Sequence, residues 1–200
     1  STIDYDRKGS GPLLILVAGA LQHRAADETT PAMADDLADQ FTVLNFDRRG
    51  RGASTDKAPY ATQREIEDIE ALIDANGGKA NLFGMSSGAV LALEATAALP
   101  DKVTGAFLYE PPIDPGSSPA QSQKLHADMA ALAEAGDREA MLTSFVFYTG
   151  MPEEALQGFK QSPDWAKFAA VALTLEHDYR VLADAREGEA PPARWGKIAV

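Results

Sequence analysis

The sequence contains no cysteine, which excludes a disulfide framework, cysteine-ligated zinc, iron–sulfur clusters and thiol catalysis. Positive charge is scarce, because 18 Lys and Arg stand against 30 Asp and Glu and leave a formal charge of −12. That balance argues against nucleic acid or an anionic membrane surface as a partner, since positive charge supplies most of the affinity there. Long apolar runs are missing too: the longest, residues 13–18, is far below the roughly 18 residues of a membrane-spanning helix. The polar, acidic start does not have the pattern of a signal peptide, so a cytoplasmic location is expected.

The composition that remains is that of a globular domain. The chain has 200 residues, of which 45% are hydrophobic and 24% charged, as in an ordinary folded protein. Short apolar runs at residues 13–17, 41–46, 80–83 and 103–109 predict buried strands, separated by segments of helical pattern. Strands joined by single helices favour an α/β fold with a mostly parallel sheet and flanking helices. Such a sheet binds ligands beyond the carboxyl ends of its strands, so the loops after these runs are the candidate sites.

Two helix starts in the first half are predicted from their capping residues. Thr30 precedes Pro31, so Thr30 is expected to be the N-cap and Pro31 the first helical residue. Thr62 and Glu65 have the spacing of a capping box and lead into an apolar stripe at helical spacing. In a capping box the Glu65 carboxylate would bind back to the helix N-terminus.

From residue 113 to about residue 193 the strand-like runs stop and helix starts recur. Ser118, Asp137 and Ser162 each precede a helical pattern, and two of them are followed by proline. This pattern predicts an all-helical insertion that acts as a lid. Its aromatic residues are expected mainly to pack, and the side chains expected to shape an apolar pocket for a substrate are Phe145, Phe147, Tyr148 and Phe168, with Met151 and Trp165 as further candidates.

One motif carries chemistry. Gly84, Ser86 and Gly88 form a G-x-S-x-G pattern between a predicted strand and a predicted helix. A sharp turn in this position lifts the Ser86 hydroxyl clear of the sheet, and the two glycines keep Cβ atoms out of the crowded sides of the turn. The helix that follows points its N-terminus at the site, where it favours developing negative charge. Ser86 is therefore the candidate nucleophile.

With this motif the chain resembles the α/β-hydrolase fold superfamily, in its group of serine hydrolases, and the resemblance extends over essentially all 200 residues. Residues 47–54 (Asp-Arg-Arg-Gly-Arg-Gly-Ala-Ser) resemble the D-x-R-G-x-G-x-S turn of that superfamily. Residues 17–20 (Val-Ala-Gly-Ala) occupy the place of its His-Gly oxyanion loop, with Ala18 where many members have histidine. The resemblance implies that the backbone N–H groups of Ala20 and Ser87 form the oxyanion hole, for which no particular side chain is needed.

The resemblance also implies a division of the chain. Residues 1–112 would be the N-terminal part of the hydrolase core, residues 113–193 the helical lid, and residues 194–200 the start of the C-terminal core portion. In the superfamily two more strand–helix units follow the lid and carry the acid and the histidine of the catalytic triad. We therefore expect both groups beyond Val200, in a portion that this sequence lacks.

Within the chain the candidates for base and acid are weaker. His23 precedes Ser86 and breaks the superfamily order of serine, acid and histidine, whereas His126 and His177 lie in the expected lid. We interpret His177 as an exposed helix residue with acidic neighbours. Glu110 follows the fourth predicted strand, where some α/β hydrolases place their acid. Glu110 is therefore the candidate acid. The alternative is a purely structural role, in which its carboxylate caps the lid or binds a backbone N–H at the strand end.

The predicted function is that of a serine hydrolase. Ser86 would attack the carbonyl carbon of an ester-like substrate and form an acyl-enzyme that water releases. The alternative is a protein of the same fold that binds a ligand without turning it over. No cofactor and no metal are expected. The expected partners are a small-molecule substrate and, as one option, a second copy of the chain in a homodimer.

The basic turn at Arg48, Arg49 and Arg51 has a competing interpretation as a nucleic-acid patch. In an acidic chain without interleaved aromatic residues, a turn whose arginines pair with nearby carboxylates is the simpler interpretation. The same stretch lacks the third glycine of a dinucleotide-binding fingerprint and does not open a helix, which excludes that site as well.

Overall fold

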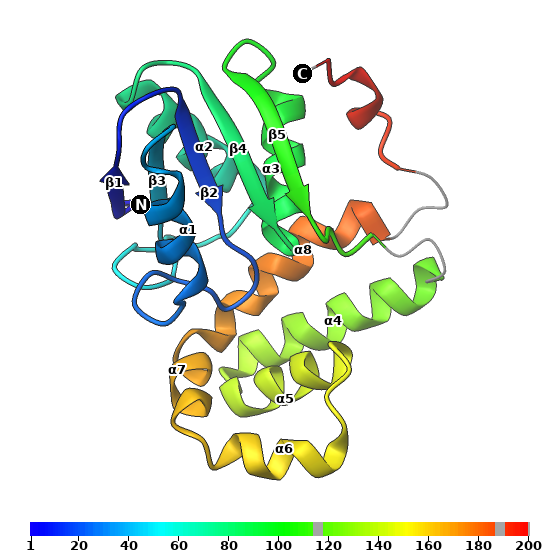
Figure 1. Cartoon of the computed structure of the whole chain (residues 1–200). Helices are drawn as coiled ribbons and strands as arrows, with labels where there is room; N and C mark the ends of the chain where they lie inside the picture. The colour runs from blue at the N-terminus through cyan, green and yellow to red at the C-terminus, as the bar shows by residue number, and fades with distance from the viewer. Residues whose placement is uncertain (114–117, 187–190, 200) are drawn as a thin grey trace.

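The computed structural model describes residues 1–113, 118–186 and 191–199, and its centre is a five-stranded sheet (Figure 1). The strand order is β1-β3-β2-β4-β5, and all neighbours pair in parallel except β1 and β3. The predicted mostly parallel sheet with flanking helices is therefore confirmed. The strands are β1 (Tyr5–Lys8), β2 (Leu13–Val17), β3 (Thr42–Phe46), β4 (Ala80–Met85) and β5 (Val103–Tyr109).

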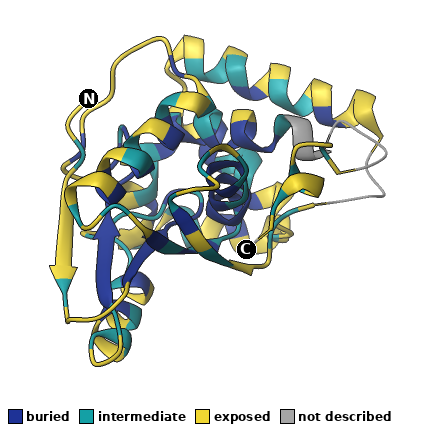
Figure 2. Ribbon diagram, turned by 90° about the horizontal axis from the view of Figure 1, so that it is seen from above, coloured by how far each residue is buried: buried dark blue, intermediate teal, exposed yellow. Residues whose placement is uncertain are grey.

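Helices cover both faces of the sheet, which explains why β2 is apolar at every position. Strand β3 is equally buried and includes Thr42 and Asn45, whose side chains donate to the Gly11 carbonyl and the Thr30 hydroxyl. Helix α1 (Thr29–Leu37) lies on one face, and α2 (Thr62–Ala75) and α3 (Ser87–Ala98) lie on the other (Figure 1). Leu14 and Leu16 pack on the α1 side, whereas their neighbours in the strand belong to the larger core with α2 and α3. A parallel strand buried on both faces is a nearly continuous apolar run, and a polar residue in it needs a hydrogen-bond partner. Figure 2 shows this buried interior and the exposed outer sides of the surrounding helices.

Strand β1 was not predicted from the sequence. Its residues are Tyr-Asp-Arg-Lys, and they are exposed or half-buried, so it has no apolar pattern. It lies at the sheet edge, antiparallel to β3, where backbone pairing and the ion pairs of Asp6 with Arg24 and of Lys8 with Asp35 hold it. A polar edge strand also blocks pairing with a second chain.

Both predicted caps in the first half are wrong. Thr30 lies inside α1, and the Asp27 carboxylate instead accepts the backbone N–H groups of Thr29 and Thr30 at 3.0 and 3.1 Å. Helix α2 begins after Ala61 without a side-chain cap. Glu65 does not turn back to that N-terminus, because its carboxylate is buried against an arginine of the turn after β3. Tertiary ion pairing outweighs the local capping bond here.

The run 118–186 is helical as expected, and the helix starts at Ser118, Asp137 and Ser162 are confirmed. These helices lie beyond the carboxyl ends of β2, β4 and β5 (Figure 1). They have their own apolar core, which includes Met129, Met141 and the core-side residue Leu21. The elements are α4 (Pro119–Ala135), α5 (Arg138–Tyr148), α6 (Glu153–Lys160), α7 (Pro163–Val171), the short 3-10 turn Ala172–Thr174 and α8 (Leu175–Arg186).

The end of the described chain does not form a strand. Trp195–Lys197 is a 3-10 turn, and within residues 191–199 no strand follows it. Trp195 Nε1 donates to Glu94 on α3 at 3.0 Å, and this bond ties the segment to the core. The predicted domain limits stay a prediction. In the described residues no helix is both long and apolar enough to cross a membrane, and the cytoplasmic location also stays a prediction.

Candidate active site

The turn between β4 and α3 holds Ser86 in a conformation that side chains rarely adopt. Its φ is 54° and its ψ is −124°, whereas the residues of β4 before it and α3 after it are regular. The Ser86 N–H donates to the Tyr109 carbonyl of β5 at 2.9 Å, which fixes the turn against the neighbouring strand. Such strain persists only where the surroundings impose it, and it occurs preferentially at functional sites. The sequence-predicted nucleophile is thus at the top of a sharp strand-to-helix turn.

Gly84 and Gly88 are both required by close backbone approaches. A Cβ on Gly84 would lie 2.5 Å from Ala89 Cα, and a Cβ on Gly88 would lie 2.2 Å from the Val17 carbonyl oxygen. Neither neighbour is a side chain that can rotate away. The predicted reason for the two glycines of the motif is confirmed, and Gly88 also lets α3 approach the backbone of Val17 and Ala18 closely.

The structure brings the three residues of the predicted catalytic machinery into one cavity. Ala20, Ser86 and Ser87 line a small cavity of about 90 Å³ at the carboxyl edge of the sheet. The sheet supplies one wall, and the other wall comes from α5 and α8 of the helical segment. The remaining lining residues are Pro112, Phe145, Tyr148, Thr149, Asp178, Tyr179 and Leu182.

The aromatic residues predicted to shape a pocket divide into two groups. Phe145 and Tyr148 line the Ser86 cavity, and Phe145 also lines a larger one of about 300 Å³, together with Phe168 and Phe159. Trp165 belongs instead to the interior of the helical segment, where its Nε1 donates to Glu139 at 2.7 Å. Among the others, Phe147 is 42% exposed, and Met151 packs on the helical core.

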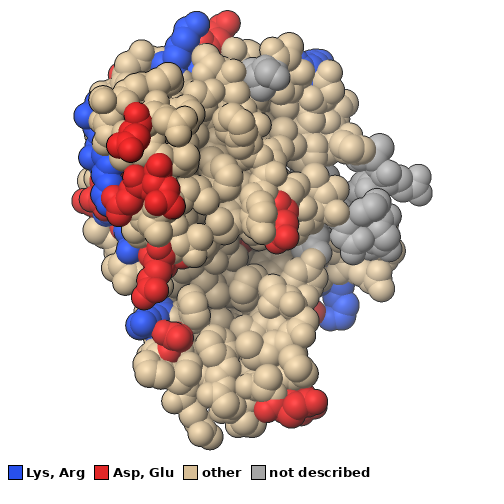
Figure 3. Space-filling view, viewed as in Figure 1, with Lys and Arg blue, Asp and Glu red and all other residues tan. Residues whose placement is uncertain are grey.

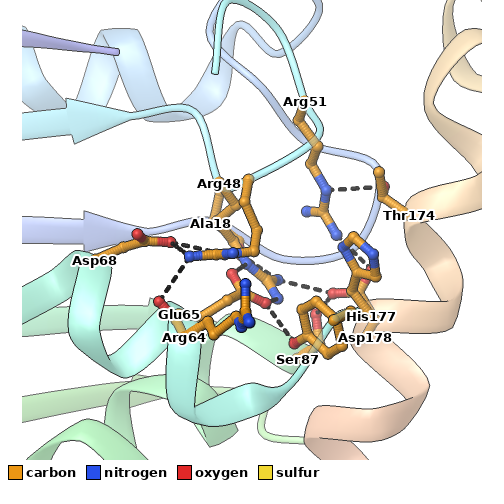
Figure 4. Close-up of polar contacts among 12 residues, drawn as sticks. Ala18, Arg48, Arg51, Arg64, Glu65, Asp68, Ser87, Thr174, His177 and Asp178 are labelled. Atoms are coloured by element: carbon orange, nitrogen blue, oxygen red, sulfur yellow. Dashed lines mark hydrogen bonds and ion pairs between the residues drawn. The ribbon is translucent and has the colours of Figure 1, made fainter. Parts of the chain in front are cut away.

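The arginines of the turn after β3 are buried in ion pairs, as the sequence predicted (Figure 4). Arg48 binds Glu65 through Nε and Nη2 at 2.7 and 2.6 Å, and its Nη1 lies 2.7 Å from Asp178 on α8. Arg51 binds the other oxygen of the Asp178 carboxylate. The sequence did not identify Asp178 as the partner, because it follows the turn by about 130 residues.

The charges of this buried cluster stabilise one another. Burial opposes ionisation of Glu65, but the Arg48 guanidinium and the Tyr60 hydroxyl outweigh it and lower the pKa of Glu65 to about 2. Two guanidinium groups and two carboxylates balance to zero net charge. Removal of one member would leave an uncompensated buried charge, which typically costs about 3–5 kcal/mol.

None of the three histidines forms a hydrogen bond to Ser86 in the part of the chain that the structure describes. His177 is not exposed as predicted. Its ring stacks on Tyr60 with centroids 3.9 Å apart, and burial lowers its pKa. Burial also lowers the pKa of His23, and His126 packs edge-on against Tyr179. The general base is therefore not assigned to any of them.

Glu110, the candidate acid, lies at the end of β5 as predicted. It is exposed, and its φ of 46° places it in the left-handed region that favours glycine. Tyr109, the residue before Glu110, accepts the backbone N–H of Ser86 through its carbonyl oxygen. Both strained residues thus meet at one edge of the sheet, and the acid role of Glu110 stays a prediction.

Two carboxylates of α1 and the turn before it are engaged in structural contacts. Asp27, which lines the larger cavity, caps α1, whereas Asp35 pairs with Lys8 on β1 toward the amino ends of the parallel strands. Figure 3 shows most of the charged residues of this face gathered along its left margin, away from the centre. Over the described ranges there is no cluster of three or more His, Asp or Glu side chains arranged to hold a metal ion.

Comparisons with known proteins agree with this architecture. The model of the alpha/beta hydrolase family matches residues 14–200. A crystal structure of an alpha/beta hydrolase from Sphaerobacter thermophilus DSM 20745 is 42% identical, with a TM-score of 0.82 over 99% of this chain and 75% of that one. The enol-lactonase from Burkholderia xenovorans LB400 shares the fold at 18% identity and a TM-score of 0.64, over 94% of this chain and 70% of that one.

Curated relatives match over a shorter region. The Bacillus subtilis (strain 168) protein named "Uncharacterized hydrolase YraK" is 31% identical over 115 residues, which are 56% of this chain and 41% of that protein. The matched region thus spans less than half the length of this relative.

Proposed function

Because the chain belongs to the alpha/beta hydrolase family, we propose that the whole protein is a serine hydrolase that cleaves an ester-like substrate through an acyl-enzyme on Ser86. One observation carries this proposal: Ser86, in a strained turn, opens into a cavity that it shares with Ala20 and Ser87. The G-x-S-x-G serine of α/β hydrolases sits on a strained turn of this kind, and two backbone donors beside its hydroxyl would stabilise the oxyanion of acyl transfer.

The geometry supports the following steps. A general base takes the Ser86 proton while Oγ attacks the carbonyl carbon, and the carbonyl π electrons move to its oxygen. The N–H groups of Ala20 and Ser87 bind that oxyanion, and the N-terminus of α3 adds a favourable dipole. Collapse of the intermediate expels the alcohol, which takes the proton from the base. Water then repeats the sequence on the acyl-enzyme and releases the carboxylic acid.

The cavities favour an apolar acyl group. The Ser86 cavity is small, and the larger cavity beside it shares both Ala20 and Phe145 with it. Its other walls are mostly apolar, with Asp27 and Glu28 also among the lining residues. These carboxylates disfavour an anionic substrate through like-charge repulsion. We propose neutral esters, lactones or thioesters with a compact apolar acyl group as the substrate class.

Tyr179 adds a further polar group to the wall of the Ser86 cavity. It is 4% exposed and lines the Ser86 cavity, yet its hydroxyl has no hydrogen-bond partner among the described residues. A buried unpaired hydroxyl costs free energy that a bound partner restores. Burial raises the pKa of Tyr179, so the hydroxyl keeps its proton and can donate to a substrate oxygen.

A fluorophosphonate probe tests the proposal directly. The probe reacts with a serine only when that serine is activated and the oxyanion hole is formed, so we expect labelling of the protein and a peptide adduct on Ser86. Ser86→Ala must abolish labelling. Ser118→Ala, which removes a surface hydroxyl that caps α4, must not. Ligand binding without labelling or ester hydrolysis would favour the alternative, a binding protein of the same fold.

A further inference from the structure

The peptide group between Gly19 and Ala20 is held by an arginine. Arg51 Nη1 donates to the Gly19 carbonyl oxygen at 2.6 Å. The carbonyl of Gly19 and the N–H of Ala20 belong to the same trans peptide plane, in which they point in opposite directions. Fixing the carbonyl on Arg51 therefore fixes the direction of the Ala20 N–H, which is one of the two proposed oxyanion donors. A charged partner on the carbonyl also polarises the plane and makes the N–H a stronger donor.

Arg51 itself is immobilised by the helical segment. Its Nε donates to Thr174 Oγ1 at 3.0 Å, and its Nη2 donates to Asp178 Oδ2 (Figure 4). All three guanidinium nitrogens are thus used, and the residue is 1% exposed. Thr174 and Asp178 both come from the stretch that leads from α7 into α8. A planar fork with three fixed acceptors has one orientation, which a lysine ammonium would not reproduce.

The second proposed donor is attached to the same carboxylate. The Ser87 hydroxyl donates to Asp178 Oδ1 at 2.7 Å, so the residue that carries the donor N–H is tied to α8 through its side chain. Within its own turn, the carbonyl of Ser86 accepts the Ala89 N–H at 2.9 Å and orients the Ser87 N–H in the opposite direction. One carboxylate on α8 therefore connects the two sides of the proposed oxyanion hole.

We infer that Arg51 and Asp178 are positioning residues for the oxyanion hole: Arg51 orients the Ala20 N–H through the Gly19 carbonyl, and Asp178 holds both Arg51 and Ser87. Neither residue transfers a proton or bonds to the reacting carbon. The inference rests on the proposed function. It also makes the packing of α8 against the sheet a condition for catalysis. If α8 moved away, Arg51 would lose its contacts to Thr174 and Asp178 at the same time.

The chain offers a matched control in the same turn. Arg49 is also buried and also binds a carboxylate, Asp68, at 2.7 Å, but its partners include neither an oxyanion-loop carbonyl nor Asp178. Arg51→Lys and Arg49→Lys make the same chemical change, keep the charge and remove the fork geometry. A difference in kcat between the two variants therefore measures the effect of the Arg51 guanidinium geometry on the proposed oxyanion hole.

The experiment compares an ester with its thionoester, in which sulfur replaces the carbonyl oxygen and binds an oxyanion hole poorly. We expect Arg51→Lys to lower kcat for the ester by about 10- to 100-fold, below the roughly 10²–10³ cost of losing a donor outright. The ester-to-thionoester rate ratio should fall by a similar factor, with little change in KM. Arg49→Lys should leave the ratio at its wild-type value.

A loss of folded protein would lower both rates equally and leave the ratio unchanged, so an unchanged ratio in Arg51→Lys overturns the inference. If Arg51→Lys fails to fold, Thr174→Val is the second test. It removes the acceptor of Arg51 Nε, keeps all four charges of the buried cluster and nearly the same shape, and it must lower the ratio as well. Wild-type protein that neither labels with fluorophosphonate nor cleaves any ester overturns the proposed function and this inference with it. Wild-type activity with an unchanged ratio overturns the inference alone.

Discussion

The Ser87 hydroxyl and the Asp178 carboxylate are joined by a hydrogen bond of 2.7 Å, and both side chains are almost completely buried. This contact links the first residue of α3, directly after the proposed nucleophile Ser86, to the helix that returns from the helical segment to the sheet (Figure 1). The helical segment is therefore attached at the site itself and not only at its periphery.

Ser87→Ala removes the hydroxyl and keeps the backbone N–H. We expect the free energy of unfolding to fall by about 1.5–3 kcal/mol, the range for a hydrogen bond to a charged group. Because Arg48 and Arg51 still hold Asp178, kcat should fall less than in Arg51→Lys. Chemical denaturation and ester kinetics measure the two effects. Unchanged stability would contradict the structural role of this bond.

Gly88→Ala tests the crowding at the turn that holds Ser86. The new Cβ would meet the carbonyl oxygens of Val17 and Ala18 at 2.2 and 2.5 Å, so α3 would have to move away from β2. We expect a loss of more than about 4 kcal/mol in unfolding free energy, or no folded protein. Gly158→Ala in α6 is the control, because nothing lies within 4 Å of its Cβ position, and it should stabilise by up to about 1 kcal/mol.

His177 predicts a pH dependence of stability. Burial lowers its pKa in the folded state, so below about pH 6.5 the unfolded chain binds more protons at this residue than the folded one. Its contribution is thus complete above that pH and is lost as the pH falls toward the lowered value, by at most about 1.4 kcal/mol per pH unit. His177→Phe keeps a flat ring on Tyr60 and should flatten the unfolding free energy between pH 6.5 and 5. The same slope in both proteins would show that His177 titrates normally.

Tyr179→Phe tests the proposed contact to substrate. The hydroxyl has no partner among the described residues, so its removal should leave the melting temperature unchanged or slightly raised. If it donates to a substrate oxygen, KM should rise by about 3- to 10-fold, which corresponds to a net hydrogen bond of about 0.5–1.5 kcal/mol. An unaltered kcat/KM across esters of different acyl groups would exclude this contact.

Glu110 is tested by two substitutions. Its φ of 46° disfavours any side chain, so Glu110→Gly should raise the unfolding free energy by about 1 kcal/mol. If Glu110 orients the catalytic base, Glu110→Gln should lower kcat by about 10⁴-fold, as neutralising the acid of a triad does. Full turnover by Glu110→Gln would discard the acid role and leave the strain to be explained by the chain's exit from β5.

Local signals in the sequence were sufficient for several features. The apolar runs predicted β2 to β5. Burial on both faces is the reason for β2 and β3, whereas β5 has an apolar sequence although most of its residues are exposed or half-buried. Ser118 and Asp137 predicted helix starts, since each side chain accepts an N–H within its own first turn. Ser162 stands before a third start, where Pro163 opens the helix without a side-chain cap. Strand β1 was not predicted, because a polar strand at the sheet edge pairs through its backbone and has no apolar side-chain pattern.

By itself the sequence determined the turn at Ser86, because only glycine fits at Gly84 and Gly88 and only small residues tolerate the sharp change of direction. Only the tertiary structure decided which charges meet. Glu65 binds Arg48 and does not make the predicted capping bond. Asp178, near the end of the helical segment, binds Arg51 and Ser87. Ion pairs between distant residues depend on how the elements pack, and no spacing in the chain encodes them.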